Sequence, residues 1–266
     1  MVHVLLKNMR KKILSGILPP LIIVLMIIML AGVWPTVKDQ MAAFVDILQN
    51  PVYEAILGQL GVGDISTYQG FFNIEVFTMT EMVMIFVTML IPARMITSEV
   101  DKRTLDITIS YPISRWQLIL EKFSAYLIYN LLYPILIIIT TIISNEILQE
   151  EFNYVLLTYA AIGTWLLFFA LGAISLLCGA IFLEGKKAIA AAGGIILGMW
   201  AIIRISGFID ELDFLRYLSL FNYLNAAVIF EAVKMPLDEL FILIGVGLAS
   251  LIGALVIFDK RELAIV

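Results

Sequence analysis

Apolar residues dominate this chain in six long runs, which polar or charged segments separate. The runs cover about residues 13–34, 76–96, 123–144, 156–183, 188–206 and 240–258. Each has roughly the 20 residues that an α-helix needs to cross about 30 Å of hydrocarbon. Inside a bilayer the backbone must satisfy its hydrogen bonds within the segment, so we expect every run to be a helix. The pattern predicts an all-α integral membrane protein in which residues 1–266 form a single transmembrane domain.

The composition favours a bilayer over water as the solvent. Hydrophobic residues make up 62% of the chain and charged residues 15%, whereas a soluble domain is nearer half apolar and a quarter charged. The first apolar run continues without a small-residue cleavage pattern, so we interpret it as a retained span and not as a signal peptide. We therefore expect a multi-pass protein of the plasma membrane.

Lysine and arginine predict the orientation. With six spans, thirteen of the 17 basic residues fall on the side of the two termini, and basic residues concentrate on the cytoplasmic side. Both termini are then cytoplasmic. The four basic residues on the outer side are Lys38, Arg204, Arg216 and Lys234. Residues 1–12 are basic and amphipathic, which predicts a helix along the inner leaflet in contact with anionic lipid.

The segment 208–238, before the last run, leaves alternatives open. Its part 214–230 is apolar enough to enter the membrane but contains Arg216, Asn222 and Asn225. A seventh full span would place the basic C-terminal tail outside, against the charge rule. We therefore expect an outer helix pair that is either interfacial or re-entrant.

The longest polar interruption on the predicted cytoplasmic side covers residues 98–122, and we expect its part 98–116 to be a cytoplasmic coupling loop. Its apolar positions recur at helical spacing and predict an amphipathic helix: Val100, Thr104, Ile107 and Tyr111. Pro112 ends this helix. Ser114, followed three residues later by Gln117, predicts a capping box at the start of the helix that leads into the third span. Such a short helix, joined on both sides to membrane helices, can pass motion from a docked soluble protein into the bundle.

At this segment the sequence resembles the ABC-2-type permeases, the membrane subunits of ATP-binding-cassette exporters. Members of that family commonly have a Glu, a basic residue and Gly-Thr-Leu after the second span, then Pro-Ile/Val-Ser-Arg and a Lys entering the third. The matching residues are Glu99, Lys102, Thr104, Leu105, Pro112, Ile113, Ser114, Arg115 and Lys122. Arg103 stands where the family has Gly, so the local turn departs from the family pattern.

The resemblance implies that the segment is a coupling helix seated in a groove of a nucleotide-binding subunit. The residues that would couple to the ATPase are Glu99, Lys102, Arg103, Thr104, Leu105, Ile107, Tyr111, Pro112, Ser114 and Arg115. It also implies an ATP-driven exporter with two ATPase subunits and a second permease copy or paralogue around the substrate path. ATP and magnesium would then bind the partner ATPase, and we expect no cofactor on this chain.

The sequence itself offers no site for ATP. A phosphate loop needs Gly, four residues, then Gly-Lys-Ser/Thr, and the nearest stretch, 179–187, has five intervening residues and a lysine in place of the hydroxyl. One Cys (Cys178) and one His (His3) exclude a disulfide framework, a Cys/His zinc site and a Ser-His-Asp triad. The net charge of −5, spread over loops, indicates no nucleic-acid partner. We expect no catalytic or metal site, and a membrane-embedded enzyme is disfavoured.

Two features lie inside the spans. Glu81 is an acid in the second span near its outer end, and such a carboxylate indicates a cation or proton contact. This would suit an ATP-independent secondary transporter or channel; otherwise Glu81 reaches the outer interface or bonds to a neighbouring helix. Ala190, Gly194 and Gly198 form one face of the fifth span, where small residues let helices pack within the bundle or across a dimer.

Overall fold

The computed structural model describes residues 2–48, 67–101, 114–206, 210–224, 229 and 237–261. In these ranges the chain is mostly helical and contains no strand. Six of the described helical stretches are long and apolar enough to cross a membrane, and their bounds are Ile17–Gln40, Tyr68–Asp101, Arg115–Leu148, Tyr154–Phe182, Gly185–Ser206 and Leu237–Lys260. The prediction of an all-α protein with six transmembrane helices is confirmed at this level.

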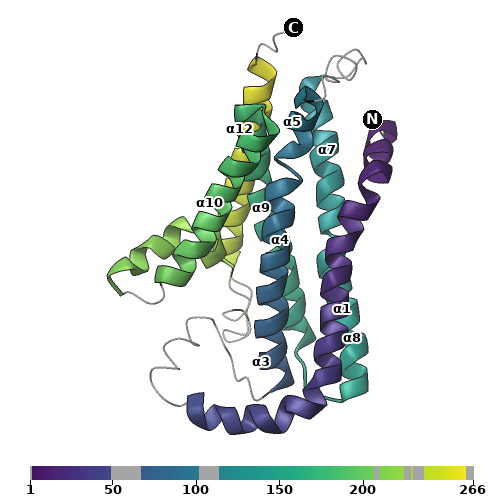
Figure 1. Ribbon diagram of the computed structural model, residues 1–266, viewed down its shortest axis with the longest axis vertical. Helices are drawn as coiled ribbons and strands as arrows, with labels where there is room; N and C mark the ends of the chain where they lie inside the picture. Colours follow the sequence, from purple (N-terminus) through teal and green to yellow (C-terminus); the bar gives the residue numbers. More distant parts are fainter. Residues whose placement is uncertain are drawn as a thin grey trace.

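The helices form one elongated bundle (Figure 1). In chain order they are α1 (Val2–Leu48), α3 (Tyr68–Phe72), the π-helical turn η1 (Asn73–Phe77), α4 (Thr78–Leu90), α5 (Arg94–Asp101), α7 (Arg115–Asn130), α8 (Leu132–Leu148), α9 (Tyr154–Phe182), α10 (Gly185–Ser206), the 3₁₀ segments η2 (Asp210–Leu218) and η3 (Leu220–Asn222), and α12 (Leu237–Lys260). The second span thus consists of α3, η1, α4 and α5, and the third of α7 and α8.

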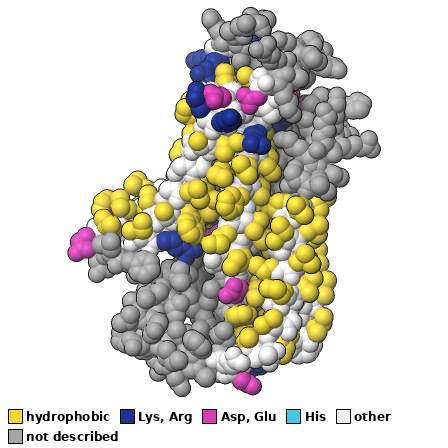
Figure 2. All heavy atoms as spheres, viewed as in Figure 1, with side chains coloured by type: hydrophobic (Ala, Val, Ile, Leu, Met, Phe, Trp, Pro, Cys, Tyr) yellow, Lys and Arg dark blue, Asp and Glu magenta, His cyan; other side chains and the backbone are white. Residues whose placement is uncertain are grey.

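Helix α9 is the centre of the bundle. Helices α4, α5, α8, α10 and α12 all pack against it, and 67% of its most apolar stretch is buried, against 22% for both α10 and α12. A helix that is apolar on every side belongs in an interior. The other spans expose large apolar side chains around it, and Figure 2 shows these over the flank of the bundle. Such an outer surface suits lipid and not water.

Helix α1 is continuous over Val2–Leu48. The predicted inner-leaflet segment 1–12 is therefore part of the same helix as the first span from Val2 onward, and its position along a membrane surface stays a prediction. Near its other end α1 turns, so that its last turns run across the end of the bundle (Figure 1). Pro35 lies inside this helix, and a proline removes one internal hydrogen bond, the usual cause of such a bend.

The second span begins earlier than the apolar pattern predicts. Its first helical residue is Tyr68 and not a residue near position 76. Thr67 caps this start, because its Oγ1 accepts a hydrogen bond from the Gly70 amide at 3.1 Å. The helix is then interrupted at residues 91–93, around Pro92, before α5 begins.

The two ends of the bundle are distinct. The first residues of α1 and the last of α12 lie at the same end (Figure 1), which we call the inner end after the predicted topology; the opposite end is the outer end. Which side of the membrane each faces stays a prediction. After α10 the segments η2 and η3 pack back against α10. The choice between interfacial and re-entrant for 208–238 stays open, since much of 225–236 is outside the described ranges.

Candidate functional site

The predicted coupling segment is described only at its two ends. Lys102, Arg103, Thr104, Leu105, Ile107, Tyr111 and Pro112 fall within 102–113 and lie outside the described residues. Glu99, Ser114 and Arg115 are described. The structure therefore defines how the bundle holds the segment's ends, a set of contacts that we call the inner frame: Glu99, Asp101, Arg115, Lys122, Gly185 and Arg261.

An ion pair attaches the first end of the segment to α7. The Nζ atom of Lys122 lies 2.6 Å from Oε1 of Glu99, and it also donates to the backbone oxygen of Met95 at 2.9 Å. Both charged side chains are largely buried. A charge-assisted contact of this kind holds geometry better than an exposed pair. Lys122, which matches the family pattern, therefore joins α5 to α7.

Asp101 attaches the same end to α10. Its Oδ2 atom accepts a hydrogen bond from the amide of Gly185, the first residue of α10, at 3.3 Å. A carboxylate at a helix N-terminus is favoured by the helix dipole. A Cβ atom at position 185 would lie 2.6 Å from that oxygen, so a larger residue there would displace the Asp101 carboxylate. Sequence reasoning missed both residues, although Asp101 adjoins the motif.

The junction between α4 and α5 also lies directly against α9. A Cβ atom at Gly179 would lie 2.8 Å from the backbone oxygen of Ala93. Thr97 donates its hydroxyl hydrogen to the same oxygen at 3.2 Å. Two backbones can approach this closely only where a side chain is missing. The interruption in the second span is thereby fixed against the central helix.

The second end of the segment is attached to α12. Nη1 of Arg115 donates to the backbone oxygen of Arg261 at 2.9 Å. Arg261 in turn donates to the carbonyls of Ala180, at 3.0 Å, and Ile181 near the end of α9. Half of the predicted capping box is present at the start of α7: the Ser114 amide donates to Oε1 of Gln117 at 3.0 Å, whereas the Ser114 hydroxyl has no partner within the described residues.

The inner frame therefore connects both ends of residues 102–113 to α7, α9, α10 and α12. Most of its hydrogen bonds end on main-chain atoms, whose positions follow the helices themselves. A displacement applied to the segment would reach four spans through these contacts. Figure 2 shows basic and acidic side chains gathered at this end, where a polar partner could bind.

Glu81 lies deeper than the sequence indicates. Because the second span starts at Tyr68, Glu81 is thirteen residues, or about 20 Å, along the helix from its outer end. Its Oε2 atom lies 3.5 Å from Nη2 of Arg204 in the last turn of α10. Arg204 was counted with the outer residues, yet α10 ends well short of the outer end (Figure 1).

The ring of Trp200 completes this contact. The guanidinium carbon of Arg204 lies 5.5 Å from the ring centroid, within the range of a cation–π interaction. Of the alternatives for Glu81, a bond to a neighbouring helix is the one that the geometry supports. Its depth relative to the outer interface stays a prediction. The pair joins α4 to α10 within two of the candidate spans.

The predicted small-residue face of α10 points out of the bundle. Ala190 and Gly194 are exposed, and a Cβ atom at Gly194 or Gly198 would meet no atom within 4 Å. The buried face of α10 consists of other residues: Gly185, Ala188, Ala192, Gly193, Ile196 and Ser206. The prediction that this face packs within the bundle is therefore wrong. The alternative, that it packs across a dimer, stays a prediction.

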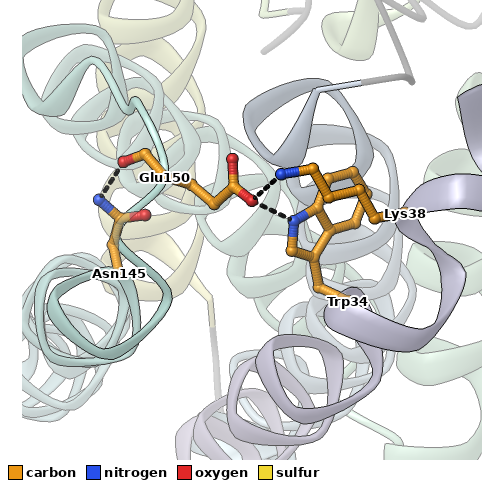
Figure 3. A network of polar contacts seen from close by, with 4 residues as sticks. All are labelled: Trp34, Lys38, Asn145 and Glu150. Carbon is orange, nitrogen blue, oxygen red and sulfur yellow. Dashed lines mark hydrogen bonds and ion pairs between the residues drawn. The ribbon is translucent and has the colours of Figure 1, made fainter.

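A second polar network lies at the outer end (Figure 3). Glu150, in the turn between α8 and α9, accepts hydrogen bonds on Oε1 from Trp34 at 3.0 Å and from Lys38 at 2.7 Å. The Lys38 and Trp34 donors hold the pKa of this carboxyl below its usual value. Asn145 donates to the backbone oxygen of Glu150 at 2.9 Å. The network ties the end of α1 to the α8–α9 turn, and no sequence pattern indicated it.

Comparison with known families agrees with the six spans. The family model described as ABC-2 family transporter protein matches residues 3–263, nearly the whole chain. A search of curated proteins finds no match. The family match and the six apolar helices identify a multi-pass transmembrane permease of the ABC transporter type. The chain therefore belongs to the ABC-2 family of transporter proteins.

Proposed function

We propose that this chain is the permease subunit of an ATP-driven exporter. It forms the substrate path as a dimer, and two separate ATPase subunits, which bind ATP and magnesium, dock at its inner end in the cytoplasm. Permeases of the ABC-2 family typically pair with ATPase subunits. The observation that supports coupling is the inner frame, which fastens both ends of residues 102–113 to the transmembrane helices.

The frame suggests how force would enter the bundle. An ATPase that displaces residues 102–113 would pull on α5 and α7 together, because Glu99 and Lys122 join them. Asp101 would carry the displacement to α10, and Arg115 to the end of α12. These helices surround α9, so their joint tilt would open a path between two permeases. Glu99 and Arg115 are the residues through which we expect this transmission.

Coupling is tested in the complete complex of permease and ATPase reconstituted in nanodiscs. Two measurements are needed: the rate of ATP hydrolysis, and the ATP-dependent change in distance between spin labels at the exposed positions Glu146 and Leu237. We expect Glu99→Gln and Arg115→Gln to reduce the distance change per ATP hydrolysed severalfold while the ATPase still co-purifies. Glu184→Gln, in the exposed Glu184–Lys187 pair near the same end, is the matched control and should have no effect.

A charge reversal separates the two roles that Glu99 could have. Glu99→Lys combined with Lys122→Glu restores the ion pair within the chain but inverts the charge that a partner would meet. Restored coupling would assign Glu99 to the frame, and lost coupling would assign it to the docking surface. Normal coupling in both single variants, Glu99→Gln and Arg115→Gln, would contradict the proposal.

The alternative is an ATP-independent transporter or channel that uses Glu81. The ion pair with Arg204 gives no support to it, because the carboxylate already faces a cation on the adjacent helix. That alternative requires ion-gradient-driven flux in liposomes that contain this chain alone. Such flux, with no dependence on an ATPase, would replace the exporter proposal.

A further inference from the structure

The outer end contains a pocket of about 760 Å³ that the inner frame does not touch. Its lining comes from two places in the chain: residues 67–69 at the start of α3, and residues 150–155 in the turn that leads into α9. The turn is fixed, since Asn153 caps α9 and the Asn153 amide donates to Oε1 of Gln69 at 2.7 Å. The pocket therefore has a defined shape on both sides, within the described part of the chain.

Aromatic rings form the apolar wall of this pocket. Tyr68, Phe152 and Tyr154 line it. Their ring centroids lie 5.9 Å apart between Tyr68 and Phe152, and 5.7 Å apart between Phe152 and Tyr154. Behind them Trp34 packs on Tyr68 at 5.6 Å. The faces of such rings attract cations, and their area suits an apolar body.

Polar atoms in and behind the wall of this pocket lack partners within the described residues. Tyr68 is 1% exposed, and its hydroxyl has no hydrogen-bond partner in the described part of the chain. The same holds for Oδ1 of Asn145, which is 6% exposed and which Figure 3 shows turned away from the Glu150 backbone oxygen. Glu150 uses one carboxylate oxygen for both Trp34 and Lys38, and no bond to the other occurs among the described residues. The acceptors that line the pocket are the carboxylates of Glu150 and Glu151, and carboxylates form their strongest hydrogen bonds with charged N–H donors.

The local charge favours a cationic donor over a neutral one. Glu150 and Glu151 line the pocket, and Lys38, which bonds to Glu150, is the described cation of this network. Two carboxylates and one ammonium leave one negative charge. A cation with N–H donors and an apolar body would satisfy the charge, the acceptors and the rings together.

We propose that this outer pocket binds an organic ammonium cation, a protonated amine carried on an apolar body. The ammonium group lies between the carboxylates of Glu150 and Glu151, and its apolar part lies on the rings of Phe152 and Tyr154. The source is a free amine or the ethanolamine headgroup of a lipid. This proposal does not depend on ATP or on coupling, because no residue of the inner frame takes part in it.

The test is equilibrium binding to the full chain in nanodiscs of phosphatidylglycerol, a lipid without an ammonium group. The probe is phenethylamine, which is protonated at neutral pH, and 2-phenylethanol is its neutral counterpart of similar shape. We expect the alcohol to bind at least about tenfold more weakly. Glu151→Gln should weaken the amine about two- to fivefold. Glu146→Gln removes an exposed acid that does not line the pocket, and it should leave binding unchanged.

Tyr68→Phe is a second control, because it removes a shielded hydroxyl and keeps the ring. We expect unchanged binding of both the amine and the alcohol. Nanodiscs that contain phosphatidylethanolamine distinguish the sources: a lower apparent affinity for phenethylamine there assigns the pocket to the lipid headgroup, and an unchanged affinity assigns it to free amines. Equal binding of amine and alcohol, or equal binding by wild type and Glu151→Gln, would overturn the proposal.

Discussion

The inner and outer ends of this bundle join the same helices by different means. At the inner end, single charged side chains reach the main chain or one another across helices, as in Lys122 to Met95 and Arg261 to Ala180. At the outer end, large aromatic rings pack together around one ion-paired carboxylate. Directional bonds fix positions but contribute little net free energy each, whereas buried rings contribute much and fix position less sharply. The difference suggests that the outer end stabilises the fold and the inner end transmits displacement.

Experiments can test whether the two ends of the bundle have these different roles. Substitutions at the outer end should lower the stability of the permease and leave its coupling to an ATPase intact once folded. Substitutions in the inner frame should weaken coupling and change the stability of the permease less. A third location, the pair of Glu81 and Arg204, lies between the two ends and should show some of both effects.

The largest effect is expected for Trp34→Ala at the outer end. Trp34 is 1% exposed and packs on Tyr68 and Phe71. Its loss removes the ring and one donor to Glu150, so we expect about 3–5 kcal/mol less free energy of unfolding. Denaturant unfolding in mild detergent measures this. Leu25→Ala, at a position of α1 that is 67% exposed, is the control and should change little. If Trp34→Ala lowers the free energy of unfolding by less than about 1 kcal/mol, the outer end does not have the stabilising role proposed for it.

Glu81→Gln should have the next largest effect. It leaves Arg204 without a counter-charge inside the membrane region, and removal of one partner from a buried pair costs about 3–5 kcal/mol. Because the two side chains are 20% and 28% exposed, we expect a smaller loss, about 2–3 kcal/mol. Arg204→Gln should behave alike, and the double variant should lose less than the sum of both. Additive losses in thermal unfolding would show that the two residues do not act as a pair.

Much of this architecture could be predicted from the sequence, for physical reasons that also explain what could not. Six apolar runs mark six spans because each lipid-exposed helix must be apolar over about 20 residues. The start of the second span was predicted too late, since its first turns, from Tyr68 to Phe77, pack inside the protein and need not be uniformly apolar. The hydrogen bond from the Ser114 amide to Gln117, one half of the predicted capping box, was predictable because it is local.

Long-range partners were not predictable. Glu81 with Arg204, Lys38 with Glu150, and Asp101 with Gly185 are each separated by more than eighty positions in the chain. A single sequence gives no measure of which charges meet across helices. The face of α10 was likewise ambiguous, because Gly193 and Gly194 are adjacent small residues. The structure buries Gly193 against Met89 and leaves Gly194 facing outward.

Gly179→Ala should perturb the inner end to a smaller degree. The new Cβ would lie 2.8 Å from the Ala93 backbone oxygen, and a backbone atom cannot rotate away, so α9 and the α4–α5 junction must separate. We expect a loss of about 1–3 kcal/mol together with weaker coupling. Gly194→Ala is the matched control, because its Cβ meets nothing within 4 Å; a helix gains about 0.5–1 kcal/mol from that exchange. The test is the thermal unfolding of both variants. Equal unfolding temperatures for Gly179→Ala and Gly194→Ala would contradict the close approach of α9 to the α4–α5 junction.

The smallest effect concerns pH and the outer ion pair. Lys38 and Trp34 hold the pKa of the Glu150 carboxyl below its usual value, so the folded protein binds fewer protons at this group than the unfolded chain does. The stabilisation is therefore complete above about pH 4.5 and disappears as the pH falls through the lower folded pKa. Its size should stay below about 1 kcal/mol, because the Lys38 and Glu150 side chains are 52% and 23% exposed. We expect the difference in unfolding temperature between wild type and Glu150→Gln to shrink between about pH 5 and pH 3, and a difference that stays constant would mean that the ion pair does not exist in solution.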